Sequence, residues 1–137
     1  MLKITTILFS VLFFLFSCKS KFEDCTDQDY ASCNTEQPQT GRITILLTIN
    51  QENPSVPVRV YEGNFEDGRL VRADTIRMRS FNYFLTPGKD YSFTATYNDG
   101  NSKIMTVDGG RIKVSTYRMC ELRCYELNNP EIDLRLY

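Results

Sequence analysis

Apolar residues occupy every second position along most of the chain after Gly41. This period of two predicts β-strands that bury one face, because successive side chains of a strand point to opposite sides. We expect strands at 43–49, 56–60, 70–78, 82–85, 91–97, 103–107, 111–116 and 132–136. No window has the spacing of a strong helix, so the pattern predicts an all-β domain of seven or eight short strands.

Turn-forming residues separate these predicted strands. Asp99-Gly100 is typical of the centre of a type I′ hairpin, and Pro87-Gly88 suits the two central positions of a type II turn. Asp108-Gly109-Gly110 predicts a second hairpin, so that 91–116 forms a three-stranded meander. Because alternation gives each sheet one buried and one solvated face, we expect the strands to form an antiparallel β-sandwich.

The N-terminal segment has a different pattern, with a basic start and a single apolar run. Lys3 is followed by thirteen almost wholly apolar residues, 4–16. This run is shorter than the roughly 17–25 residues that cross a bilayer. Ser17 then supplies a small residue before Cys18, which completes the layout of a secretory signal. We therefore predict a cleaved signal peptide at 1–17, a polar tether at 18–40 and a β domain at 41–137.

The end of the signal segment, Leu15-Phe16-Ser17-Cys18, resembles the lipobox of bacterial lipoproteins. The resemblance implies that cleavage occurs just before Cys18 and that the Cys18 thiol carries a diacylglycerol. Two or three acyl chains together give a stable membrane anchor, whereas one chain gives a marginal one. The alternative is an ordinary signal peptide cut nearby, which leaves Cys18 as a thiol that pairs or reacts.

The chain contains five cysteines, an odd number. Setting Cys18 aside leaves Cys25, Cys33, Cys120 and Cys124, an even set that predicts two disulfides in an exported chain. The pairing is either local, within each pair, or one of two arrangements that attach the N-terminal segment to the end of the domain. We favour disulfides that attach the N-terminal segment to the end of the domain. Residues 25–39 are too polar to be held on the domain by burial of apolar side chains. A four-thiolate metal site is the alternative, but these cysteine intervals fit zinc motifs poorly.

The composition bears on catalysis and on nucleic-acid binding. The absence of histidine removes the commonest general base and the usual nucleophile pairs. Carboxylate pairs such as Glu62 with Glu66, or Asp67 with Asp74, are more typical of solvated turns than of a glycosidase site. We predict that the protein is not an enzyme and that it uses no metal or cofactor. A formal net charge of −1 without a basic cluster predicts no nucleic-acid partner.

Tyrosine is the aromatic residue best suited to a binding surface, because it combines apolar area with a polar tip. Tyr91, Phe93 and Tyr97 are in phase with one another and are expected in the core. Tyr61 is out of phase with the apolar positions of its strand. It is therefore the best candidate for an exposed residue that contacts a ligand.

Three segments share a strand–turn–strand pattern: Val58-Arg59-Val60-Tyr61, 81–88 and 91–95. Together they resemble the prealbumin-like β-sandwiches, which include carboxypeptidase regulatory-like and collagen-adhesin B-type domains of exported proteins. This likeness covers 41–97 and implies an immunoglobulin-like or prealbumin-like sandwich. The whole chain is also similar to small lipoproteins of the Bacteroidota, on its segment 25–33 and the cysteine pair near its end. That similarity implies a lipid-anchored location at the outer membrane, on its periplasmic face or at the cell surface.

These features together predict a non-catalytic interaction or structural module that a lipid anchor holds at the cell envelope. The alternative is a glycan- or ligand-binding accessory lipoprotein of a nutrient-uptake system, with Tyr61 as a contact residue. The expected partners are the membrane, through the anchor on Cys18, and a protein or a glycan.

Overall fold

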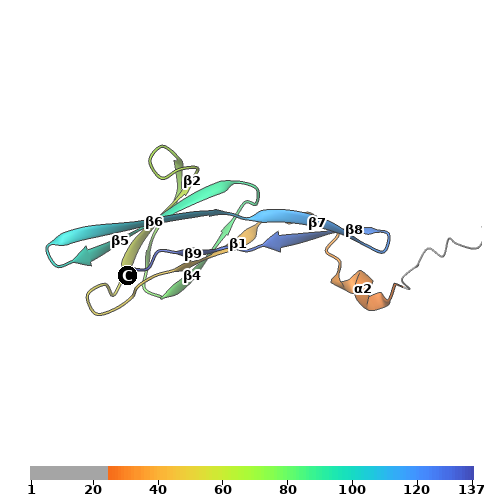
Figure 1. Cartoon of the computed structure of the whole chain (residues 1–137), viewed down its shortest axis with the longest axis horizontal. Coiled ribbons are helices and arrows are strands. Elements are labelled where there is room, and N and C mark those ends of the chain that lie inside the picture. The colour runs from red at the N-terminus through yellow and green to blue at the C-terminus, as the bar shows by residue number, and fades with distance from the viewer. Residues whose placement is uncertain (1–24) are drawn as a thin grey trace, which may run out of the picture.

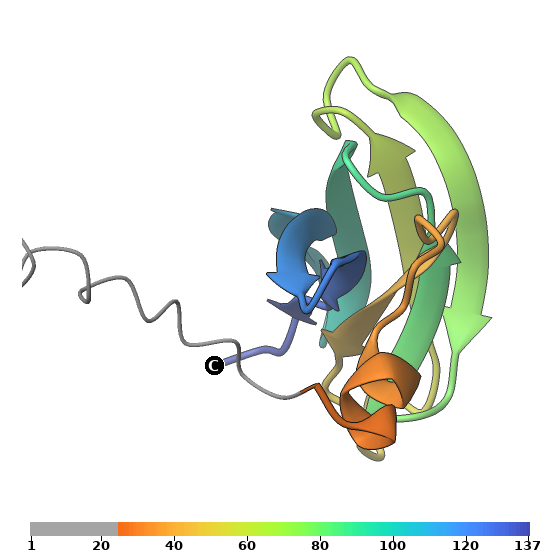
Figure 2. The ribbon, with the colours of Figure 1, turned by 90° about the vertical axis from the view of Figure 1, so that its right-hand side faces the viewer.

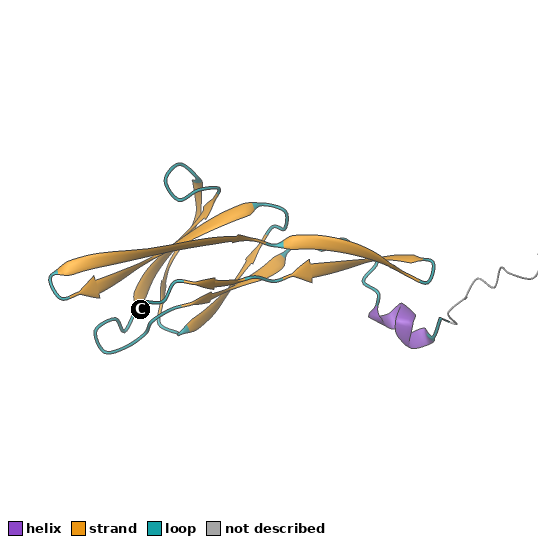
Figure 3. Ribbon diagram, in the orientation of Figure 1, coloured by secondary structure: helices purple, strands orange, loops and turns teal. Residues whose placement is uncertain are grey.

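The computed structural model describes residues 25–137, so the predicted signal segment and Cys18 lie outside the described residues. Strands account for most of the described chain (Figures 1 and 3), which confirms the all-β prediction. A short helix, α2 (Asp27–Ser32), precedes them. The strands are β1 (Gly41–Leu46), β2 (Val56–Glu62), β3 (Arg69–Ile76), β4 (Ser80–Leu85), β5 (Asp90–Asp99), β6 (Ser102–Arg111), β7 (Lys113–Met119), β8 (Leu122–Asn128) and β9 (Glu131–Asp133).

The strands of the described chain form three sheets, with the orders β4-β1-β9, β3-β2-β5-β6 and β7-β8. Paired strands are antiparallel except β1 and β9, which run parallel with Ile45 opposite Ile132. The expectation of seven or eight antiparallel strands was therefore wrong, since residues 25–137 contain nine strands and one parallel pair. The parallel pair arises because the chain leaves the body as β7, returns as β8 and continues in the direction of β1.

The two larger sheets bury their apolar faces in one common core. The residues that face it from β1, β2 and β5 are all buried: Ile43, Ile45, Val56, Val58, Val60, Tyr91, Phe93, Ala95 and Tyr97. They occupy every second position, as the period of two predicts. Ile132 and Leu134 add to the same cluster from the C-terminal segment. Each large apolar side chain buried in this way contributes about 1.5–3 kcal/mol.

The hydroxyl of Tyr97 connects three parts of this core. It donates to the Leu134 carbonyl at 2.8 Å and accepts from the Thr48 backbone N–H at 3.2 Å. The Thr106 hydroxyl donates to the same carbonyl at 2.8 Å. Burial raises the pKa of the Tyr97 phenol, so the group stays protonated and remains a donor. The hydroxyl thus ties β5 to the end of β1 and to the C-terminal segment.

The predicted meander over 91–116 was wrong in its second turn. Asp108, Gly109 and Gly110 lie inside β6, which pairs with β5 along its whole length. A Cβ at Gly110 would lie 2.8 Å from Ile132 Cδ1, so this glycine makes room for the segment that carries β9. The Asp108 carboxylate accepts the Asp133 N–H at 2.9 Å. These residues therefore pack and bind the returning chain, and they do not form a turn.

The other two predicted turns lie where the sequence places them, with one change of register. Gly88 has a φ of 83°, which the third position of a type II turn requires. In the β5–β6 hairpin Asp99 pairs with Ser102, so Gly100 and Asn101 are the central residues. Of these, Gly100 alone has a positive φ, of 59°, which is the pattern of a type II′ turn. The predicted type I′ turn centred on Asp99-Gly100 is thus shifted by one residue.

The hairpin β7–β8 projects from one end of the molecule (Figure 1), and the C-terminus lies toward the other end. Figure 2 looks onto the end with the hairpin, where blue β7–β8 and orange α2 both face the viewer. The hairpin begins directly after the buried Ile112 and turns through Cys120 and Glu121. Most of its side chains are exposed or half-buried.

Replacing Tyr97 with phenylalanine tests the role of its hydroxyl. The change leaves the N–H of the half-buried Thr48 without its acceptor and removes one of two donors to the Leu134 carbonyl. We expect the free energy of unfolding to fall by about 1–3 kcal/mol, measured by urea denaturation. Tyr117→Phe is the control, since its ring lies on the exposed hairpin, and it should change stability by less than about 0.5 kcal/mol. Equal stabilities of the two variants would contradict this account.

Candidate functional site

Two disulfides attach the N-terminal described segment to the hairpin. Cys25 is bonded to Cys120, and Cys33 to Cys124, across separations of 95 and 91 residues. This is one of the two long-range connectivities considered above, and the local pairing does not occur. The Tyr125 N–H also donates to the Asn34 carbonyl at 2.8 Å. We call the hairpin Lys113–Asn128, together with the cross-linked residues 25–34, the arm.

The sequence of the attached segment favours a single helical turn. Thr26 caps α2, because its hydroxyl accepts from the Asp29 N–H and the Asp29 carboxylate accepts from the Thr26 N–H at 2.8 Å. This reciprocal arrangement satisfies two backbone donors that would otherwise be free. The Thr26 hydrogen bonds also lower the pKa of the Asp29 carboxyl. The cap places Cys25 and Cys33 at the two ends of the helix.

The two cross-links stabilise the arm by different amounts. The first closes a loop of nearly 100 residues, worth about 4.7 kcal/mol in the chain-entropy model. Once it is present, the second closes only the short ring through 25–33 and 120–124, worth about 3 kcal/mol. Cys120 also has a φ of 57°, in the left-handed region that non-glycine residues rarely adopt. Its disulfide holds it at a turn position where glycine would be usual.

One face of the arm carries two opposed arginines. Arg118 lies directly opposite Arg123, and Thr116 opposite Tyr125, so the four side chains share a face. The Arg123 guanidinium lies 5.8 Å from the centre of the Tyr125 ring. Next to the turn is a shallow depression of about 330 Å³, lined by Thr116, Tyr117, Arg118, Glu121 and Arg123. We call Thr116, Arg118, Arg123 and Tyr125 the arginine face.

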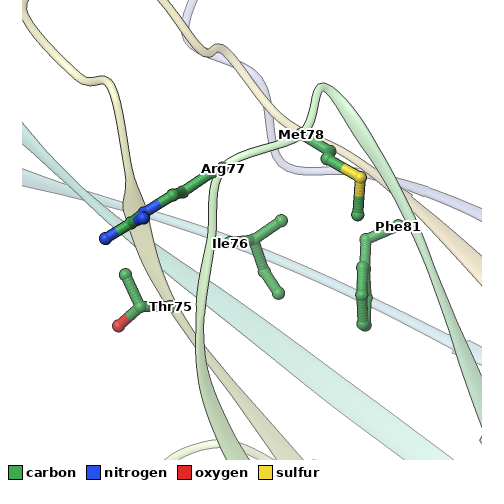
Figure 4. A pocket seen from close by; sticks show the side chains of 5 residues that line it. All are labelled: Thr75, Ile76, Arg77, Met78 and Phe81. Atoms are coloured by element: carbon green, nitrogen blue, oxygen red, sulfur yellow. The ribbon is translucent and has the colours of Figure 1, made fainter.

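An apolar depression of about 460 Å³ lies at the opposite end of the body, at the turn between β3 and β4. Its lining residues are Thr75, Ile76, Arg77, Met78 and Phe81 (Figure 4). The Arg79 carbonyl of this turn accepts the Leu47 N–H at 2.9 Å, which fixes the turn against the end of β1. Met78 is 55% exposed although it is apolar. We call this feature the distal pocket.

Tyr61, the residue predicted to be exposed and to contact a ligand, is half-buried rather than fully exposed, and its role as a ligand contact stays a prediction. It does lie on the outer face of its sheet, where its phase places it, but Leu70 and Ser92 pair with it on both sides. The register shift between Val60 and Tyr61 brings Leu70 opposite the ring. Among the described tyrosines, the exposed ones are Tyr30, Tyr117 and Tyr137.

Two of the four carboxylates considered for catalysis, Glu62 and Asp74, take part in local interactions. The Glu62 carboxylate forms ion pairs with Lys89, whose Nζ lies at 2.9 Å, and with Arg69, whose nearest guanidinium nitrogen lies at 2.7 Å. The hydrogen bond from Lys89, and then that from Arg69, lowers the pKa of the Glu62 carboxyl. Asp74 accepts the Tyr83 hydroxyl at 3.0 Å. Burial, and then this hydrogen bond, raises the pKa of Tyr83.

Residues 25–137 contain neither a cluster of metal ligands nor a membrane-spanning helix. Within that range no group of three or more cysteine, aspartate, glutamate or histidine residues is placed to hold a metal ion. Over the same range, no helix has the length and apolar character to cross a membrane. Comparison of the chain with protein-family models, with curated proteins and with solved structures finds no match.

Sequence reasoning missed the arginine face and the buried Asn53. The Asn53 side chain donates to the Asn98 carbonyl at 3.1 Å and accepts the Asn98 N–H at 2.7 Å, so it binds the β1–β2 connection to β5. The Asn-Pro dipeptide at 53–54 signals a turn but not this burial. Arg118 and Arg123 could be paired only once the turn at Cys120-Glu121 is known, and that turn lacks the usual glycine or asparagine.

The disulfide connectivity is open to direct mapping. Trypsin cuts after Arg123 and so separates Cys120 from Cys124, and chymotrypsin cuts after Tyr30 and so separates Cys25 from Cys33. Mass spectrometry of the unreduced double digest should show the Cys25 peptide joined to the Cys120 peptide, and the Cys33 peptide to the Cys124 peptide. A Cys25 peptide joined to either Cys33 or Cys124 would overturn the description of the arm.

Proposed function

We propose that the protein is a non-catalytic interaction module of the cell envelope, anchored by a diacylglycerol on Cys18. The single observation that carries this proposal is the double cross-link between residues 25–33 and the hairpin. Two disulfides are typical of a chain that folds in an oxidising compartment outside the cytoplasm. They also place the start of the described chain, a few residues after Cys18, at one end of the body.

The arrangement of the two ends supports an interaction role. The arm occupies the end next to the proposed anchor, and the distal pocket lies at the other end of β1. An exposed methionine beside an apolar depression is typical of a surface that accepts a partner's apolar side chain. We infer that the arm works as a spacer and that the distal pocket contacts a protein partner.

We further propose that the two larger sheets form a prealbumin-like β-sandwich. Support comes from their shared core, to which β1, β4 and β9 contribute from one sheet and β2, β3 and β5 from the other. The parallel β1–β9 pair and the arm are additions to that architecture in this chain.

Replacement of Cys18 by serine tests the anchor. We expect the wild-type protein to stay in the membrane fraction during extraction with high salt, and the Cys18→Ser variant to be absent from that fraction after the extraction. Mass spectrometry of the purified wild-type N-terminus should show a diacylglycerol on residue 18. An unmodified Cys18, or a cleavage site elsewhere, would disprove the anchor, and the variant controls for any peripheral association of the domain.

Site-specific photo-crosslinking tests the distal pocket. A photoreactive residue at Met78 in the full chain, produced in its own cells, should give one discrete protein adduct. The same residue at Phe84, which is also exposed and apolar but lies outside the distal pocket, should give none. Phe81→Asp should remove the adduct, because it places a charge in the apolar lining. Equal labelling from both positions, labelling from neither, or an adduct to a glycan would contradict a protein contact here.

A further inference from the structure

The two arginines of the arginine face oppose each other without an ion pair. Like charges at directly opposed positions destabilise a hairpin. Both side chains are exposed, and neither takes part in any of the ion pairs found within residues 25–137. Glu121 lines the same depression but forms no ion pair there. The arrangement therefore costs stability within the fold and is suited to an anion bound from outside.

The chemistry of the arginine face suits a phosphate group. A guanidinium presents a planar fork of donors that matches phosphate oxygens, and two opposed forks can hold one anionic surface between them. Thr116 and Tyr125 add two hydroxyl groups to the same face. Tyrosine is also enriched where proteins meet the headgroups of a bilayer.

The cross-link places this face close to the proposed anchor. Arg118 and Arg123 flank Cys120, whose Cα lies 6.1 Å from that of Cys25. Cys18 precedes Cys25 by seven residues. A fully extended chain of that length spans at most about 25 Å. An acylated Cys18 would thus keep Cys25 within this distance of the membrane surface, and the arginine face lies only the cross-link and two or three residues further on.

The tether itself supplies no net charge toward a membrane. Lys19 and Lys21 are offset by Glu23 and Asp24.

The arm as a whole has a formal net charge of −1, because it contains three basic residues and four acidic ones: Lys113, Arg118, Arg123, Asp27, Asp29, Glu121 and Glu126. Its positive charge is concentrated on the arginine face, since Glu126 lies on the opposite face of the hairpin. The segment that carries Asp27 and Asp29 is bonded to Cys124, which also lies on that opposite face. Charge complementarity then favours an anionic lipid surface as the occupant of the arginine face.

We propose that the arginine face binds the phosphate headgroups of the bilayer in which the lipid anchor is inserted. This inference rests on the proposed anchoring at Cys18 and adds a second contact to it. The two contacts together would fix the orientation of the molecule, with the arm on the membrane and the distal pocket directed away from it.

Vesicle binding tests the contact separately from the anchor. The test protein is the chain from residue 19 onward without the lipid, which retains both disulfides and the whole described core. It should sediment with vesicles of phosphatidylglycerol and phosphatidylcholine, and not with phosphatidylcholine alone. Binding should weaken as salt is raised, because exposed charges are screened beyond about 10 Å at 0.1 M.

Two double variants assign the binding to particular residues. Arg118→Gln with Arg123→Gln should weaken binding by about 25-fold, at roughly fivefold for each basic residue near an anionic surface. Arg59→Gln with Arg72→Gln is the matched control, since both residues are exposed on the four-stranded sheet. Circular dichroism of each variant should match that of the wild type, and the control should bind like the wild type.

Tryptophan fluorescence provides a second readout. The chain contains no tryptophan, so one introduced by substitution is the only source of this signal. With Tyr125→Trp, on the arginine face, vesicle binding should shift the emission to shorter wavelength. With Tyr137→Trp, at the C-terminus, it should not.

Three outcomes would overturn the proposal. They are equal binding to neutral and anionic vesicles, full binding by the Arg118 and Arg123 double variant, and arginine-dependent binding of an acidic polysaccharide in place of vesicles. Failure of the anchor at Cys18 would show instead in the membrane fractionation and N-terminal mass spectrometry, which do not depend on these arginines.

Discussion

The arm depends on the two cross-links between residues 25–33 and the hairpin, and the position of the N-terminal segment depends on the arm. A two-stranded hairpin is at best marginally stable in water, because it has no second layer to bury its side chains. Here neither strand joins the larger sheets, and Cys124 is the hairpin side chain that is fully buried. The disulfides, the Asn34–Tyr125 hydrogen bond and the capped turn at Thr26 together take the place of a core.

The body supports the arm from the other side through close packing. A Cβ at Gly41 would lie 2.5 Å from Ile112 Cγ2, so the start of β1 lies directly against the residue from which the arm departs. Gly110 gives similar room to Ile132 as the chain returns from the arm. Interiors at this density transmit displacement, since neighbouring groups have no free volume to absorb it. The packing of the core therefore fixes the direction in which the arm leaves the body. That core is made of the alternating apolar residues of the strands.

The sequence predicts those parts of the fold in which one strand face meets the core, because burial there requires alternation. It predicts the attachment of the N-terminal segment to the end of the domain, but not the turn at Cys120-Glu121 or the strand β8 that follows. That turn has a positive φ at Cys120, which is a disulfide-bonded cysteine and not a glycine. Gly109-Gly110 was wrongly predicted as a turn. These glycines lie within β6, where a side chain would collide with neighbouring atoms. Tyr61 has the predicted phase, but cross-strand neighbours cover it. The error at Gly109-Gly110 comes from a contact between segments far apart in the chain, and the error at Tyr61 from the pairing of neighbouring strands, neither of which the pattern along one strand contains.

A weak headgroup contact is sufficient if the chain is already tethered. An acylated Cys18 would turn binding of the arm into an intramolecular event, with an effective concentration in the millimolar range for a short flexible linker. Two arginines then need to supply only modest affinity, and the contact remains reversible. The disulfide at Cys120 matters for this reason, because it shortens the path along the chain from Cys18 to Arg118 and Arg123 from about a hundred residues to about ten. The anchor and the disulfide, together with a weak electrostatic contact of the two arginines, would then orient the molecule on the membrane without a large interface.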